Sequence, residues 1–137
     1  WDLPADALIP GAASRLLQQS QLERLQQAGL QTIVCGANVP FADEQIFYGP
    51  VAEWADQHFA VIPDFVANLG MARVFAYLMQ PGATLSDEAI FSDVSSIIHE
   101  AVNQISNSTD NPTGLMAKAY QVTLERVLKQ KAEPEAF

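Results

Sequence analysis

The chain has 137 residues, of which 49% are hydrophobic and 17% are charged, and this composition is typical of one globular domain. Seven Lys and Arg stand against sixteen Asp and Glu, which gives a formal net charge of -9. We expect so acidic a chain to lack the basic surface patch that binds nucleic acid or an anionic membrane, and we expect neither as a partner.

The only cysteine, Cys35, excludes a disulfide within the chain, which fits a reducing compartment. The opening residues lack the basic region and the apolar core of a secretory signal. No uninterrupted apolar run approaches the ~20 residues that are needed to span a bilayer. The expected location is therefore the cytoplasm.

Three short apolar runs, each ended by turn-forming residues, predict three buried strands. They cover residues 7–9, 30–35 and 59–62, and they stop at Pro10-Gly11, Gly36 and Pro63 respectively. The segments between them can form right-handed crossovers through helices, so the strands should run parallel. This order predicts half of a doubly wound α/β sheet.

The connection between the first two strands carries start and stop signals for a helix. Ser20 and Glu23 have the S-x-x-E spacing of a capping box, in which two backbone N–H groups are satisfied reciprocally. The helix should start at Ser20, bury Leu22 and Leu25, and end at Gly29.

The next crossover is expected to contain two helical segments. Asp43 and Glu44 should begin the first of them, because the helix dipole favours negative charge at that end. Gly49-Pro50 interrupts it, and a second helix is expected over residues 50–58. Its inward-facing residues should be Val51, Trp54 and Ala55.

Residues 65–79 are apolar on almost every side, which predicts one buried helix. Arg73 is the only charge in this segment. It would either reach a carboxylate in a domain outside the chain or extend from the helix into solvent.

Helices are also predicted in the last third of the chain. Ser86 should cap a helix that has Asp87 and Glu88 in its first turn. The apolar stripe of this helix is formed by Ile90, Val94, Ile97, Ile98, Ala101 and Ile105. A final helix should follow Pro112 and run to about Lys129, with residues 133–137 frayed.

Five short motifs stand in order along the chain. They are residues 6–12 (DALIPGA), 36–40 (GANVP), 62–70 (IPDFVANLG), 112–113 (PT) and 125–127 (ERV). Their order and spacing resemble the glutamate/leucine/phenylalanine/valine dehydrogenase family over essentially the whole chain. Cys35 and Met71 depart from the family pattern, which commonly has an acidic or small residue at the first position and glycine at the second.

The resemblance implies an α/β, Rossmann-like half-domain of about three parallel strands with C-terminal helices. Residues 1–80 would be the second half of a dinucleotide-binding domain, and residues 81–137 a C-terminal helical segment. The implied reaction is the oxidative deamination of an L-amino acid such as glutamate with NAD or NADP.

Ligands of open α/β sheets bind beyond the carboxyl ends of the strands, where small residues let a flat ring approach the backbone. The candidate cofactor-binding residues are Pro10, Ala12, Gly36, Ala37, Asn38 and Asn68. The resemblance implies that Ala37, Asn38 and Asn68 face the nicotinamide end. It also implies that Ala72 and Phe75 shape the substrate pocket, where a phenyl ring replaces what is often a small hydroxyl residue.

Two parts of such an enzyme have no counterpart in the sequence. There is no G-x-G-x-x-G turn to hold the pyrophosphate. The lysine and the carboxylate of the family's chemistry belong to a preceding domain, so no catalytic residue is expected here. The chain should therefore be a portion or a remnant of something longer, inactive by itself, with the missing N-terminal catalytic domain as partner and a homo-oligomer as the native state.

The same residues also allow simpler interpretations. Asn38 could be a turn residue and Asn68 a helix-start residue. Cys35 is expected to be a small core residue, and the isolated His58 and His99 predict no metal site. The rival functions are a non-catalytic Rossmann-like interaction or regulatory module and, less in keeping with the last helices, another enzyme such as a transferase.

Overall fold

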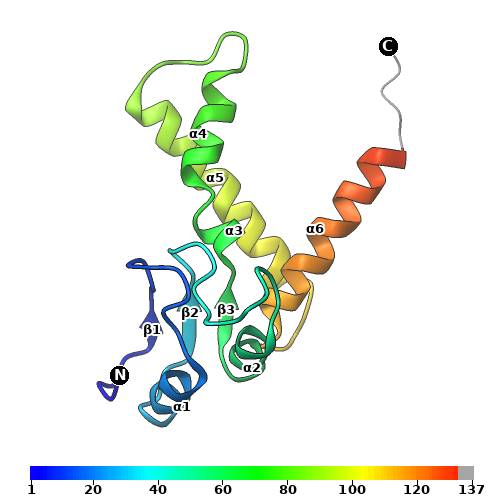
Figure 1. Ribbon diagram of the computed structural model, residues 1–137. Coiled ribbons are helices and arrows are strands. Elements are labelled where there is room, and N and C mark those ends of the chain that lie inside the picture. Colours follow the sequence, from blue (N-terminus) through cyan, green and yellow to red (C-terminus); the bar gives the residue numbers. More distant parts are fainter. Residues whose placement is uncertain (133–137) are drawn as a thin grey trace.

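The computed structural model describes residues 1–132, and the predicted fraying of residues 133–137 lies outside the described residues. Figure 1 shows a small parallel sheet from which long helices project. The elements in chain order are β1 (Ala7–Leu8), α1 (Gln19–Gln27), β2 (Thr32–Val34), α2 (Pro50–His58), β3 (Ala60–Ile62), α3 (Asp64–Ala67), α4 (Gly70–Leu78), α5 (Asp87–Ser106) and α6 (Leu115–Ala132).

The predicted α/β sheet is confirmed. Its strand order is β1-β2-β3, and both neighbouring pairs are parallel. In the register, Ile33 of β2 lies between Leu8 and Val61 of its two neighbours. The strands are shorter than predicted: β1 lacks residue 9, β2 lacks residues 30, 31 and 35, and β3 lacks residue 59.

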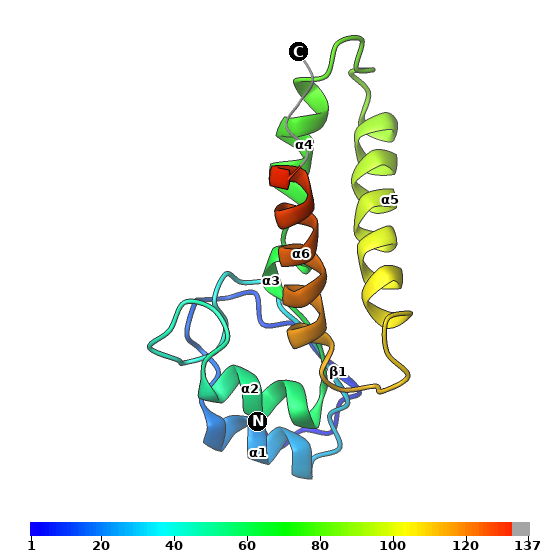
Figure 2. The ribbon, with the colours of Figure 1, turned by 90° about the vertical axis from the view of Figure 1, so that its right-hand side faces the viewer.

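The two faces of the sheet are covered by different helices, as Figure 2 shows. Ile33 and Val61 are fully buried in the main core, together with residues of α1 and α2. Ala60 and Ile62 point to the other face, because side chains alternate along a strand. They pack on a smaller core that contains Ile105 of α5.

Helix α1 is present, but its predicted start at Ser20 is wrong. It begins at Gln19, and the capping box is formed by Gln18 and Gln21. Glutamine 18 has the extended backbone of a cap residue, and its N–H donates to Oε1 of Gln21 at 2.8 Å. Burial of Leu22 and Leu25 is confirmed, and so is the helix end before Gly29, whose φ is 94°.

No helix begins at Asp43, so that part of the prediction is wrong. Asp43 is buried and instead caps α2 from a distance, since its carboxylate accepts from the N–H groups of Val51 at 2.7 Å and Ala52 at 2.9 Å. Helix α2 has the predicted bounds. Its buried residues are Ala52, Ala55 and Asp56, whereas the predicted Val51 and Trp54 are half-buried.

The buried Asp56 joins α2 to α6. Its side chain is fully buried, and it accepts from the N–H groups of Met116 at 2.8 Å and Ala117 at 2.9 Å. The hydroxyl of Tyr48 donates to the same carboxylate at 3.0 Å. Asp56 therefore supplies the acceptors that the first turn of α6 needs and fixes that turn on the domain. The helix begins at Leu115, three residues after the predicted Pro112.

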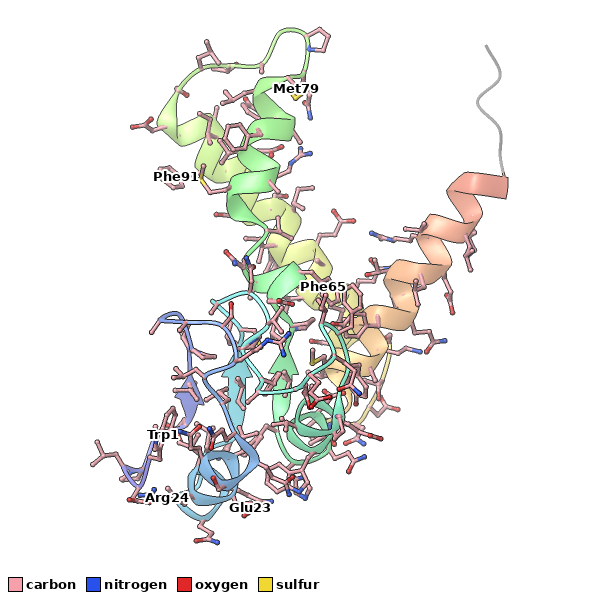
Figure 3. All side chains as sticks on the ribbon, in the orientation of Figure 1. Trp1, Glu23, Arg24, Phe65, Met79 and Phe91 are labelled. Carbon is pink, nitrogen blue, oxygen red and sulfur yellow. The ribbon has the colours of Figure 1, made fainter. Side chains whose placement is uncertain are left out.

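The prediction of one buried helix over residues 65–79 is wrong. Two helices, α3 and α4, cover the segment, and α4 has no buried residue in the described part of the chain. Among the described elements, α5 is the main neighbour of α4, so much of the apolar surface of α4 stays exposed: 65% for Met71, 61% for Phe75 and 41% for Leu78. Figure 3 shows Met79 and Phe91 at the end of the α4–α5 hairpin far from the sheet.

Helix α5 begins as predicted, with Ser86 Oγ accepting from the N–H of Ala89 at 3.2 Å. Its apolar stripe is half-buried except for Ile105, because α4 covers one end of α5 and α3 and α6 cover the other. Both predicted roles of Arg73 are wrong. Its guanidinium forms a bidentate ion pair with Asp93 of α5, at 2.6 and 2.7 Å.

This ion pair predicts that the α4–α5 hairpin loosens in acid. The hydrogen bonds from Arg73 lower the pKa of Asp93 below its ordinary value of 3.8. The stabilisation is therefore complete above pH 3.8 and is lost as the pH falls through the lower pKa of the folded state. We expect NMR contacts between α4 and α5 to weaken together with protonation of Asp93. An Asp93→Asn variant should show weak contacts at every pH, and pH-independent contacts in the natural chain would contradict the prediction.

Strand β1 is an edge of the sheet among the described residues, because β2 is its only neighbour there. Ile9, directly after β1, is apolar, and its exposed fraction is 69%. Asp2 pairs with Arg24, which ties the first residues to α1. We expect the isolated chain to cover this edge, either by self-association or with its own N-terminal residues, and a monomer with fast-exchanging β1 amides in solution would contradict this prediction.

Candidate functional site

The carboxyl ends of the three parallel strands lie at one edge of the sheet. The turns that follow them carry the candidate residues: Pro10 and Ala12 after β1, Gly36, Ala37 and Asn38 after β2, and Asn68 at the end of α3 after β3. In Figure 1 this edge is the upper end of the sheet, next to the base of α4. The fold therefore brings the three strand-end motifs together.

Two candidate side chains are in direct contact. Nδ2 of Asn68 donates to Oδ1 of Asn38 at 2.8 Å, and both residues are exposed. This bond leaves Nδ2 of Asn38 as a donor and Oδ1 of Asn68 as an acceptor. The pair thus presents one donor and one acceptor, the combination that complements a primary carboxamide.

The turns after β1 and β2 approach each other closely. The N–H of Ala37 donates to the carbonyl of Pro10 at 2.7 Å. A Cβ on Gly36 would lie 3.3 Å from Cγ2 of Ile9 and 3.5 Å from the carbonyl oxygen of Pro10, so glycine permits this approach. Ala37 is buried beneath the surface, whereas Ala12 is exposed.

Sequence reasoning missed two residues that hold this edge together. Oδ2 of Asp64 accepts from the N–H of Val39 at 2.8 Å, and Oδ1 accepts from the N–H of Phe65 at 2.9 Å. Val39 has a φ of 48°, in the left-handed region that β-branched residues avoid. Both residues belong to the strand-end motifs, Asp64 to P-D and Val39 to N-V-P. No local sequence pattern, however, indicates that a valine adopts the left-handed conformation.

Ala72 and Phe75 lie on the first two turns of α4, directly after the turn that carries Asn68. Both are exposed, and three residues separate them, so they share one helix face. In the described part of the chain, no element faces these two exposed side chains from the opposite side. Enclosed space near this edge is about 10 Å³, lined by Val39, Asp64 and Tyr120 among others, which is too small for a ligand.

Cys35 is fully buried in the main core, as predicted. Burial raises the pKa of its thiol to about 12, and the negative charges of Asp64 and Asp56 add to the effect. A pKa this high leaves very little thiolate, so the thiol is chemically inert in the folded chain.

We predict slow alkylation of Cys35 in the native protein. The rise of its pKa from 9.0 to about 12 lowers the thiolate fraction about a thousandfold, and burial restricts access further. The rates of reaction with iodoacetamide in buffer and in denaturant check this directly. Similar rates in the two conditions would show that the thiol is reachable in the fold.

The two histidines do not join the strand-end residues. His58 stacks on Trp54 with ring centroids 4.0 Å apart, and His99 contacts Asn103 on α5. Within residues 1–132, no group of His, Cys, Asp or Glu is arranged to hold a metal ion. Two open depressions of the surface lie along α5, and none of the strand-end residues lines them.

Among the described helices, none combines the length and the apolar character that crossing a membrane requires.

The fold of the chain is similar to part of a solved enzyme structure. The chain is similar to glutamate dehydrogenase from Plasmodium falciparum, whose crystal structure superimposes with a TM-score of 0.70 at 19% sequence identity. The match covers 100% of this chain and 30% of that chain, so this chain spans less than a third of that enzyme's length. No curated protein matches the sequence. The likeness establishes a Rossmann-like half-domain with C-terminal helices.

A family model described as Glutamate/Leucine/Phenylalanine/Valine dehydrogenase matches residues 1–134. The chain belongs to the glutamate/leucine/phenylalanine/valine dehydrogenase family.

Proposed function

We propose that this chain supplies one wall of the nicotinamide cleft in an NAD(P)-dependent amino-acid dehydrogenase. Residues 1–80 would be the second half of the dinucleotide-binding domain, and residues 81–137 its C-terminal helical segment. The observation that carries the proposal is the hydrogen-bonded pair of Asn38 and Asn68 at the carboxyl ends of β2 and β3.

The chemistry of this pair fits the nicotinamide end of the cofactor. The carboxamide of nicotinamide has one carbonyl acceptor and one amino donor, which match Nδ2 of Asn38 and Oδ1 of Asn68. When bound, NAD or NADP would accept the hydride of the substrate. The other end of the cofactor has no counterpart in the chain, since the glycine-rich turn for the pyrophosphate is absent from the sequence.

The neighbouring small residues would serve the flat ring rather than bond to it. Pro10, Ala12 and Gly36 keep bulky side chains out of the edge, and the buried Ala37 lets the turn after β2 lie close to Pro10. Ala72 and Phe75 would face the substrate from α4. The phenyl ring of Phe75 would narrow the space for the substrate's side chain. Glutamate and smaller apolar amino acids are therefore both substrates to test.

The remaining parts of the enzyme would come from outside the chain. The exposed apolar face of α4, including Met71 and Phe75, supports an opposing wall formed by an N-terminal catalytic domain. That domain would supply the lysine that polarises the substrate carbonyl and the carboxylate that moves protons. The chain alone would then be inactive, and the native enzyme would be a homo-oligomer.

The mass of the native polypeptide tests this proposal, with an antibody raised against the chain. A band several times larger than 14.9 kDa is expected, and the purified protein should oxidise an L-amino acid with NAD or NADP. In that protein, Asn68→Ala should raise the KM for the cofactor about tenfold, because one hydrogen bond to the carboxamide is lost. Asn103→Ala, on the exposed surface of α5, is the matched control and should leave the KM unchanged.

A second function is a non-catalytic interaction module that retains the fold. It is favoured by the same exposed apolar face of α4, where Met71 and Phe75 would contact another protein instead of substrate. A native band at 14.9 kDa, with no dehydrogenase activity in the purified protein, would support this module and contradict the enzyme.

A further inference from the structure

The turn after β2 contains a strained residue directly beside Asn38. Val39 has a φ of 48°, and a β-branched side chain is unfavourable in this left-handed conformation. Such residues persist only where the surrounding contacts enforce them, and they gather at functional sites. The contacts that enforce Val39 can be identified one by one.

Both backbone polar groups of Val39 are bonded. Its N–H donates to Oδ2 of Asp64 at 2.8 Å, and its carbonyl accepts from the N–H of Arg15 at 2.7 Å. Arg15 is itself left-handed, with a φ of 55°, and its guanidinium donates to the carbonyl of Asp43. The turn is therefore held from both sides, by the segment before α1 and by the start of α3.

Asp64 reaches both members of the asparagine pair through the backbone. Its carboxylate bonds the N–H of Val39, the residue after Asn38, and its carbonyl accepts from the N–H of Asn68 at 2.7 Å. One residue thus sets the turn that carries Asn38 and the end of the short helix that carries Asn68. Neither asparagine is buried, so packing does not fix their orientation.

We infer that Asp64 is a positioning residue, which holds Val39 in the left-handed conformation and so presets the Asn38–Asn68 pair for a carboxamide. This inference rests on the proposed cofactor role of the pair. Fixing a recognition group before the ligand arrives removes an entropic cost from binding. The strain at Val39 would then lower the stability of the fold and raise its affinity for the ligand.

Replacement of Val39 separates this role from a merely structural tie. Glycine adopts the left-handed conformation without strain, but it also frees the turn when the chain is unliganded. Val39→Gly should therefore leave the unfolding midpoint unchanged or higher, while the affinity for nicotinamide mononucleotide falls about tenfold. Asparagine also tolerates this conformation but restricts the backbone more than glycine does. Val39→Asn should keep the affinity within about threefold of the natural chain.

The exchange rate of the Asn68 side-chain amide protons gives a second measure, which needs no ligand. These protons are hydrogen-bonded to Asn38 and should exchange more slowly than those of Asn107, which is exposed at the C-terminal cap of α5. Asp64→Asn leaves only one acceptor oxygen for the two N–H groups, so it should remove this protection. Val39→Gly should reduce it without loss of stability.

The outcomes are distinguishable. If affinity and amide protection change only in step with stability across the three variants, Asp64 is a structural tie and the inference is wrong. If the natural chain shows slow Asn68 exchange but no shift with nicotinamide mononucleotide, the pair is preset but the proposed cofactor role fails. Val39→Gly with lower affinity and undiminished stability is the result that supports the inference.

Discussion

Replacing Asp56 with alanine is expected to lower the free energy of unfolding by about 4 kcal/mol, since the three hydrogen bonds that its buried carboxylate accepts are lost. The buried N–H of Met116 and the N–H of Ala117 would then lose their acceptor. The first turn of α6 is attached to the domain through these bonds, so α6 should detach along with the loss of stability. Urea denaturation of the two proteins gives the difference.

Two further variants separate the contributions at Asp56. Tyr48→Phe removes only the hydroxyl that donates to the carboxylate, and we expect it to cost about 1 kcal/mol. Asp56→Asn keeps one acceptor oxygen and should fall between Tyr48→Phe and Asp56→Ala. A loss below about 1 kcal/mol for Asp56→Ala would show that water or another group replaces the carboxylate.

The Gly49→Ala substitution is expected to cost about 2 kcal/mol, because the new methyl group meets the carboxylate that caps α2. A Cβ at this position would lie 2.6 Å from Cβ and 2.7 Å from Oδ1 of Asp43, which is far inside van der Waals contact. The backbone of Gly49 is not the cause, since its φ of -93° suits any residue. The measurement is the shift of the denaturation midpoint.

A double-mutant cycle tests the steric cause. In an Asp43→Ala background the carboxylate is gone, so Gly49→Ala should cost less than half as much as it does in the natural chain. The cap itself is lost in that background, with a cost of about 1–2 kcal/mol. Equal costs of Gly49→Ala in the two backgrounds would show that the methyl group is excluded for another reason.

The parts of the fold that depend on local pattern could be predicted from the sequence. Short apolar runs before Pro10, Gly36 and Pro63 indicated the three strands, and crossover geometry indicated that they are parallel. The bounds of α2 followed from Gly49-Pro50, and the start of α5 followed from Ser86. In each case the residues that decide the structure are neighbours in sequence.

The errors arise where distant residues decide. Asp43 bonds the N–H of Val51, eight residues further along the chain, and Asp56 bonds the N–H of Met116, 60 residues further along. Neither spacing is that of a local helix cap. Arg73 finds Asp93 only because α4 and α5 fold back on each other. The apolar residues of α4 led to the prediction of a buried helix. In the described part of the chain, however, no residue of α4 is buried, because no element covers its outer face.

The candidate site shows the same division. The turns that carry Asn38 and Asn68 were predictable from the strand-end motifs, and the structure adds that the two amides contact each other. The role of Asp64 was not predictable, because its partner Val39 is 25 residues away and its conformation has no sequence signature. The strain at Val39 becomes visible only in the backbone geometry.

The central claim is that the edge carrying Asn38 and Asn68 binds the nicotinamide end of the cofactor. An NMR titration of the chain with nicotinamide mononucleotide tests it most directly. We predict shifts confined to the Gly36–Val39 turn, Asn68 and the first turn of α4, with a dissociation constant of about 1 mM because the pyrophosphate site is missing. The shifts should disappear in an Asn38→Leu/Asn68→Leu double variant that remains folded. Shifts centred on the depressions along α5, or none at all at saturating ligand, would contradict the claim.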